Sequence, residues 1–114
     1  MKASDLRIGN LTKDKLDQTI YEIDITSLLF ISKCNKDDKE LSIEEIPLTE
    51  EWLFNFEFNF HQGKFWIDGL CVHTTDSRFY IIQEQGRVFI RNVHHLQNLY
   101  FALTGKELSI KIRP

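Results

Sequence analysis

The sequence predicts one α+β domain, in which an antiparallel β-meander packs against a long C-terminal helix. Two patterns carry this prediction. Between residues 56 and 91, apolar and polar residues alternate with period two, and Asp68-Gly69 and Gln85-Gly86 mark turns between strands. Apolar residues then recur at helical spacing, which predicts a helix over residues 92–104 with Gly105 as its stop. A length of 114 residues fits a single domain.

The N-terminal part, residues 1–45, is predicted to be a small β subregion. Residues 19–23 are rich in β-branched and aromatic side chains, and residues 28–31 form a short continuous apolar run, so both favour strands. Residues 34–40 are polar and predict an exposed loop. An SH3-like barrel is the architecture that we consider for this subregion.

The remaining residues, 46–114, are predicted to form a short helix, the meander, the long helix and a last strand. Thr49 is a good N-cap for the short helix, and Leu48 and Leu53 occupy the positions of a hydrophobic staple. Asn55 tolerates the left-handed conformation and predicts the end of this helix. The meander contains about five strands, from residue 56 to residue 91. Its last two strands, around residues 79–82 and 88–90, are apolar on both faces, so we expect them near the middle of the sheet.

The last strand is predicted from the alternation of three apolar residues with polar ones: Leu108, Ile110 and Ile112.

Charge is unevenly distributed along the chain. Residues 1–57 contain 7 basic and 13 acidic residues, a net charge of -6, whereas residues 58–114 contain 7 basic and 4 acidic residues, a net charge of +3. The acidic excess is densest at residues 37–51, which we interpret as a solvated surface, with a basic partner as the alternative. The overall net charge of -3 argues against a general nucleic-acid binder, because such proteins gain affinity by neutralising phosphates.

No catalytic or metal-binding signature occurs in the sequence. The two cysteines, Cys34 and Cys71, have no metal-ligand spacing, the histidines form no HExxH pattern, and there is no Gly-x-Ser-x-Gly nucleophile turn. No apolar run approaches the ~20 residues that span a bilayer, and the first residues do not resemble a signal peptide. We expect reduced cysteines, a cytoplasmic protein, no cofactor and no enzymatic activity.

The long helix carries a second stripe beside its apolar face. This stripe consists of His94, Gln97, Asn98 and Phe101, again at helical spacing. One aromatic ring beside two amides and an imidazole suits a surface that recognises another protein, because each polar group can hydrogen-bond to a partner. The alternative is that the helix packs between the meander and the N-terminal strands, with the stripe satisfied inside the chain and Phe101 in the core.

A second candidate surface lies on the meander. Exposed aromatic residues on a sheet stack nucleic-acid bases, and arginines supply the charge for phosphates. The aromatic residues in question are Phe56, Phe58, Phe60 and Trp66, and the arginines are Arg78, Arg87 and Arg91. Alternation of aromatic with polar residues is also the ordinary pattern of a half-buried strand, which favours the core for the phenylalanines.

Three blocks of the chain resemble a family of small uncharacterised proteins of Bacteroides-type gut bacteria, their phages and mobile elements. The blocks are DLRIGN at residues 5–10, IPLTEEWL at 46–53 and VHHLQNLYFALTG at 93–105. Two positions depart from the family pattern. Asn55 stands where members have Gly, and Leu11 is followed by polar residues where many members continue into an apolar strand, which weakens the expectation of a barrel. The resemblance implies a phage or mobile-element context and no particular activity.

Two functions stand ahead of a third, a small hydrolase or thiol enzyme, which requires a histidine within hydrogen-bond reach of Cys34, Cys71 or a serine. The favoured one is a non-enzymatic accessory or protein-interaction module that binds another protein, or itself, through the stripe of the long helix. The alternative is a nucleic-acid-associated module that uses Trp66, Arg78, Arg87 and Arg91.

Overall fold

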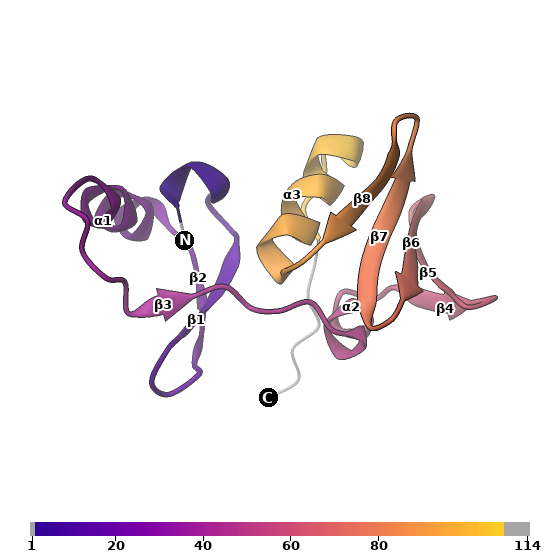
Figure 1. Cartoon of the computed structure of the whole chain (residues 1–114), viewed down its shortest axis with the longest axis horizontal. Coiled ribbons are helices and arrows are strands. Elements are labelled where there is room, and N and C mark those ends of the chain that lie inside the picture. The colour runs from indigo at the N-terminus through magenta and orange to yellow at the C-terminus, as the bar shows by residue number, and fades with distance from the viewer. Residues whose placement is uncertain (1, 109–114) are drawn as a thin grey trace.

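Two antiparallel sheets and three α-helices make up the fold in the computed structural model, which describes residues 2–108. The predicted α+β class, with a meander and a long helix after it, is confirmed. α3 stands between the two sheets (Figure 1). The elements run in the order η1 (Ala3–Asp5), β1 (Leu11–Asp14), β2 (Ile20–Glu22), α1 (Ile25–Lys36), β3 (Ile43–Glu44), α2 (Glu50–Asn55), β4 (Asn59–His61), β5 (Lys64–Ile67), β6 (Leu70–Thr75), β7 (Arg78–Gln83), β8 (Gly86–Ile90) and α3 (Val93–Thr104).

The N-terminal unit combines a three-stranded sheet, in the order β2-β1-β3, with the helix α1. It differs from the SH3-like barrel that the sequence suggested, because a helix takes the place of one predicted strand. The polar residues after Leu11 do form a strand: Lys13 lies opposite Glu44 in β3, and the two side chains form an ion pair at 3.7 Å. A cluster of buried residues holds the unit together: Leu6, Ile23, Ile31, Cys34 and Leu41.

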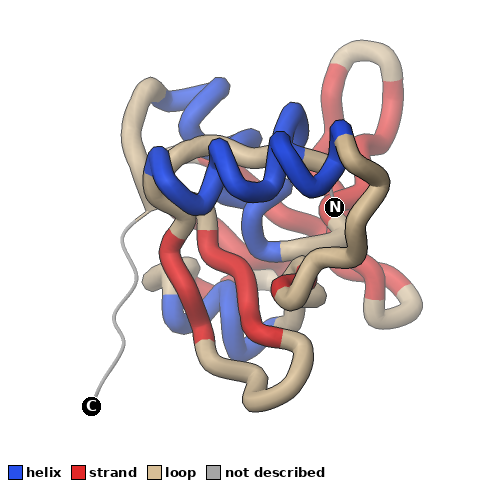
Figure 2. Tube along the Cα trace, turned by 90° about the vertical axis from the view of Figure 1, so that its left-hand side faces the viewer, coloured by secondary structure: helices blue, strands red, loops and turns tan. Residues whose placement is uncertain are grey.

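The prediction of a strand at residues 28–31 is wrong, because these residues lie within α1. Asp24 is the N-cap, and its carboxylate accepts a hydrogen bond of 2.7 Å from the backbone N–H of Ser27. Ile31 and Cys34, three residues apart, turn to the same side of the helix and are buried, so the predicted loop begins only after Lys36. Figure 2 shows α1 as a regular helix at the outer end of the molecule.

The meander contains five strands in the order β4-β5-β6-β7-β8, as predicted. Its first strand starts later than expected. Glu57 adopts the left-handed conformation with φ 69°, so Phe56 and Phe58 belong to the turn after α2, where both are buried. α2 begins after its predicted cap, Thr49, and ends at Asn55, but the left-handed residue is Glu57.

β8 lies at the edge of the meander, so the expectation that the last two strands occupy the middle is wrong for β8. The outward-facing aromatic residues of the last two strands are covered by arginine side chains, and no further strand pairs with β8 among the described residues. Tyr80 and Phe89 are directly opposite each other, and arginine guanidinium groups lie over both rings.

α3 is the helix that the sequence predicted, with Asn92 as its N-cap and Gly105 in the left-handed conformation at its end, φ 74°. Val93, Leu96 and Tyr100 pack into the main core against the inner face of the meander, together with α2. Of the predicted last strand, Leu108 is buried, and the residues from 109 onward lie outside the described residues. The acidic segment, residues 37–51, leads from the end of α1 through β3 into α2.

The cap of α1 gives a direct test of the corrected element. Replacing Asp24 by Ala removes the oxygen that accepts from Ser27, so we expect a lower urea midpoint and less helical circular dichroism. Asp24→Asn retains a capping oxygen and is the matched control, expected to stay close to the wild type. Equal midpoints and equal helicity for Asp24→Ala and Asp24→Asn would contradict this account of α1.

Candidate functional site

The second stripe of α3 faces the N-terminal unit. His94 and Gln97 are only 5% and 3% exposed. The side-chain oxygen of Gln97 accepts a hydrogen bond of 2.8 Å from the backbone N–H of Leu11, and its amide nitrogen donates one of 3.1 Å to the carbonyl of Gly9. One side chain thus joins α3 to the start of β1.

Asn98 and Phe101 extend the same joint. The Asn98 oxygen accepts hydrogen bonds from Asn10 Nδ2 at 2.8 Å and Arg7 Nε at 3.2 Å, and its amide nitrogen donates to the carbonyl of Asp5 at 3.1 Å. The guanidinium carbon of Arg7 lies 4.2 Å from the centre of the Phe101 ring, which is 40% exposed. Gln97, Asn98 and Phe101 are therefore used within the chain, and Phe101 is covered by Arg7 without being part of the core.

His94 lies at the same joint with its Nδ1 atom buried and without a hydrogen-bond partner among the described residues. Burial lowers the pKa of this imidazole below its ordinary value, and the nearby His95 acts in the same direction. The carboxylates of Glu45 and Asp5 oppose the shift without reversing it. His94 is consequently neutral in the folded protein at neutral pH.

The outer face of the meander, opposite α2 and α3, brings the predicted nucleic-acid residues together. Directly paired residues point to the same side of a sheet, so the pairs Trp66–Cys71 and His73–Tyr80 share this face, as do Tyr80–Phe89 and Ile82–Arg87. We define the outer face by eight residues on β5 to β8: Lys64, Trp66, Cys71, His73, Arg78, Tyr80, Arg87 and Phe89. Arg91 follows at the next alternate position after Phe89 and is exposed.

Aromatic rings hold the arginines of the outer face. The guanidinium carbon of Arg78 lies 4.0 Å from the centre of the Phe89 ring, and that of Arg87 lies 4.8 Å from the centre of the Tyr80 ring. His73 stacks on Tyr80, with ring centres 5.1 Å apart and planes 14° from parallel. Cation–π contacts of this kind restrict the arginine side chains while their N–H groups remain free to donate.

The electrostatics of the outer face are those of a positively charged surface. Burial lowers the pKa of His73, and the charges of Lys64 and Arg87 lower it further. Burial raises the pKa of the Cys71 thiol, against the effect of Lys64. The strand positions that point to this side, from residue 59 to residue 89, contain no Asp or Glu.

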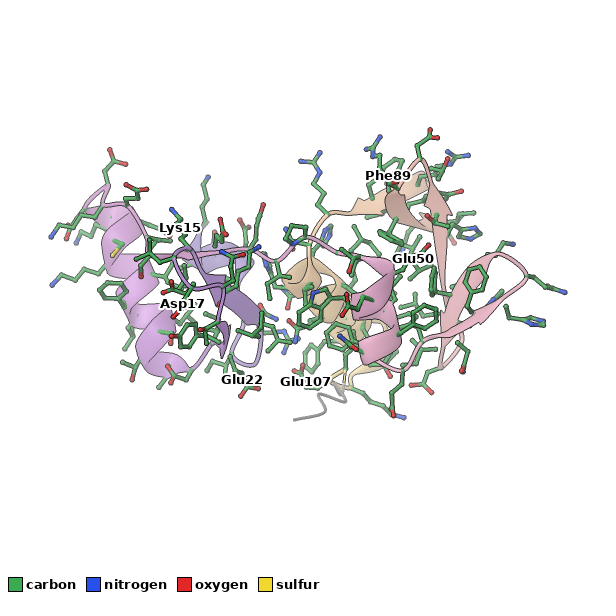
Figure 3. The ribbon with its side chains drawn as sticks, turned by 90° about the horizontal axis from the view of Figure 1, so that it is seen from below. Lys15, Asp17, Glu22, Glu50, Phe89 and Glu107 are labelled. Carbon is green, nitrogen blue, oxygen red and sulfur yellow. The ribbon has the colours of Figure 1, made fainter. Side chains whose placement is uncertain are left out.

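The meander keeps its own carboxylates in turns: Asp68, Asp76 and Glu84. The ion pairs Arg7–Glu107, Lys13–Glu44 and Lys15–Glu40 all lie away from the outer face. Figure 3 shows Asp17 and Glu22 on the N-terminal unit, and Glu50 and Phe89 in the part of the molecule that contains the meander.

The phenylalanine row does not join this surface. Phe56 and Phe58 are 1% and 2% exposed and belong to the core, as the half-buried-strand alternative expected. Phe60 is exposed at the far edge of the sheet, but its ring packs on the buried Phe65, with centres 4.9 Å apart. Trp66 is the member of the predicted set that lies on the outer face, where its indole N–H donates to the carbonyl of His61 at 3.1 Å.

Sequence reasoning missed five residues of the outer face: Lys64, Cys71, His73, Tyr80 and Phe89. The period-two alternation of the strands could have indicated them, because each lies two positions along its strand from another residue of the outer face. What the sequence lacked was the register that aligns the strands with one another.

Comparisons with known proteins give no match: no family model fits the chain, and neither curated proteins nor solved structures show a significant similarity. The resemblance of the three sequence blocks to a Bacteroides and phage family therefore stays a prediction. Within residues 2–108, His, Cys, Asp and Glu side chains do not gather in threes as a metal site would require. No helix in this described part is long and apolar enough to cross a membrane.

Gln97 is expected to be necessary for the joint between the two units. Gln97→Leu leaves the N–H of Leu11 and the carbonyl of Gly9 without their partner, which costs roughly 1–3 kcal/mol for each buried group. Urea unfolding measures the loss, and hydrogen exchange at the Leu11 amide should become faster. Gln85→Leu, at an exposed turn, is the control; equal stability of the two variants would contradict the joint.

Stability should fall as the pH is lowered from 7.5 to 5.5. The pKa of His94 is lower in the folded state than in the unfolded chain, whose histidines titrate near ~6.5, so the unfolded state takes up the proton first. His73 and His95 shift in the same direction and add to the effect. Urea unfolding across this range should show a shallower pH dependence for His94→Gln than for the wild type. The same slope for His94→Gln as for the wild type would refute the assignment.

Proposed function

We propose that the protein binds nucleic acid through the outer face of the meander, contacting the phosphate backbone. The observation that carries the proposal is the strand register, which aligns Lys64, Arg78 and Arg87 on one side of the sheet, with Arg91 next in line. Phosphate contacts from Lys and Arg supply the sequence-independent part of nucleic-acid affinity. No step of catalysis is needed for this function.

The geometry favours contacts to phosphates over stacking of bases on the rings. Tyr80 is only 9% exposed, since His73 stacks against it and Arg87 lies over it. Arg78 likewise covers Phe89. The rings therefore serve to orient guanidinium groups, and side chains held in place before binding lose less conformational entropy when the ligand arrives. This modifies the expectation from the sequence, in which aromatic rings stack the bases.

A net charge of -3 is compatible with this function because the outward-pointing strand positions of the meander carry cations and no carboxylate. The field at a surface depends on the charges near it, and exposed charges more than about 8–10 Å apart are largely screened at physiological salt. Asp17 and Glu22 lie on the N-terminal unit, away from the meander (Figure 3). A polyanion approaching the outer face meets Lys64, Arg78 and Arg87 first.

The protein-interaction hypothesis takes second place. Its surface, the stripe of α3, already binds Leu11, Asn10 and Asp5 within the chain. A partner on this surface has to displace the N-terminal unit or restrict itself to the exposed part of Phe101. An accessory role in a phage or mobile element is compatible with either function and remains part of the proposal.

Binding to a fluorescein-labelled oligonucleotide tests the proposed function by anisotropy at several salt concentrations. The affinity should fall linearly with salt on a log–log plot, and Lys64→Gln and Arg87→Gln should each reduce the slope by roughly 1 or slightly less. Lys33→Gln and Lys36→Gln remove the same charge from exposed positions of α1 and are the matched controls. Absence of binding at low salt, or equal losses for the α1 variants, would exclude the outer face as the nucleic-acid surface.

A further inference from the structure

Two arginines meet at one end of the outer face, where β7 begins and β8 ends. Phe79 is paired with Ile90, so the next position of the same register sets Arg78 opposite Arg91. Both arginines are exposed and both belong to the outer side of the sheet. Like charges directly opposite each other on neighbouring strands are destabilising. An anion that binds between the two side chains offsets their mutual repulsion.

The two arginines line a common hollow of about 340 Å³. Ser77 adds a hydroxyl group to its wall, and the apolar side chains of Leu48, Phe79 and Phe89 contribute to its lining. None of the residues that line the hollow is acidic. The hollow thus combines two guanidinium groups and a hydroxyl with an apolar floor, which suits a phosphoryl group attached to a sugar.

Contacts of the free protein fix both sides of the hollow. Arg78 is held over the Phe89 ring, as described above, at 4.0 Å. Ser77 stands in the tight turn between β6 and β7 with a left-handed backbone, φ 63°. On the other side, the carbonyl of Arg91 accepts a hydrogen bond of 3.2 Å from the N–H of Leu48. The backbone that carries each donor is therefore anchored before a ligand binds.

We infer that Arg78 and Arg91 clamp one phosphoryl group of the bound nucleic acid, with the Ser77 hydroxyl as a third donor. The inference rests on the proposed function, since the nucleic acid supplies the phosphoryl group. Guanidinium groups donate pairs of parallel N–H bonds to phosphate oxygens, so two of them can enclose one phosphoryl group from both sides. The source is either the terminal phosphate of a strand or an internal phosphodiester, which share this chemistry.

The test compares Arg78→Gln, Arg91→Gln and the double variant with Arg87→Gln, an outer-face arginine outside the hollow. Binding of a labelled oligonucleotide is measured with the full chain, and thermal unfolding verifies that each variant is folded. Each hollow variant should lose about tenfold in affinity, the effect of one charged hydrogen-bonding contact. The double variant should lose less than the product of the two, because both side chains hold the same group. Ser77→Ala alone should weaken oligonucleotide binding relative to the wild type. Added to the double variant, it should leave the affinity unchanged.

Two oligonucleotides of the same sequence distinguish the sources. If the 5′-phosphorylated strand binds more tightly than the 5′-hydroxyl strand, and this difference in affinity disappears in Arg91→Gln, the clamp holds a terminal phosphate. Equal binding of both strands, with both losing affinity in the hollow variants, assigns it to an internal phosphodiester. Losses in Arg78→Gln and Arg91→Gln that are additive and equal to that of Arg87→Gln overturn the clamp and leave the proposed function standing.

Failure of the proposed function has a different signature. If the wild-type chain binds neither oligonucleotide, pyrophosphate is titrated against it while the NMR signals of the arginine Nε–H groups are followed. Saturable shifts of Arg78 and Arg91, with Arg87 unmoved, support an anion clamp without nucleic-acid binding. No shift of Arg78 or Arg91 overturns both proposals.

Discussion

The hydrogen bonds of the Gln97 side chain determine how the two sheets are combined. Gln97 lies on the side of α3 that turns away from the meander, and it is bonded at both ends of its amide to the chain entering β1. The opposite side of α3 buries Val93, Leu96 and Tyr100 in the meander core. One helix therefore serves two units, and α2 and α3 pack on the inner face of the meander. The outer face is the side of the sheet left for a ligand.

This division of the sheet also separates the charges. The inner face is mostly apolar, because it must pack against helices, and the charged residues of β5 to β8 point outward. On the outer side the aromatic residues are not left bare: Tyr80 and Phe89 lie beneath the guanidinium groups of Arg87 and Arg78. These contacts shield the rings from water and keep the cations at fixed positions. The cation–π contacts on β7 and the edge strand β8 thus also place positive charge on the outer face of a protein whose net charge is negative.

Much of the fold was predictable from the sequence, because local signals agreed with the tertiary structure. Thr49, Asn92 and Gly105 mark helix ends through backbone chemistry that depends on neighbouring residues alone. α1 was not predicted, because a continuous apolar run is compatible with a strand or a helix and the N-cap that decides for the helix, Asp24, lies four residues before the run. For the site, Trp66 and the arginines were identified, whereas Tyr80 and Phe89 were not, since strand register is a property of pairing. Helical spacing likewise placed Gln97 on the polar stripe of α3. Spacing contains no information, however, on whether the hydrogen-bond partner of Gln97 lies inside the chain or on another protein.

An NMR titration of the ¹⁵N-labelled chain with a short oligonucleotide tests the central claim most directly. The account predicts that amide signals of β5 to β8 shift in a saturable way, with the largest changes at Arg78, Arg87 and Arg91. Signals of α1 and of the acidic segment before α2 should stay unchanged. Shifts confined to the N-terminal unit, or spectra that do not change at low salt, would contradict the assignment of the outer face as the binding surface.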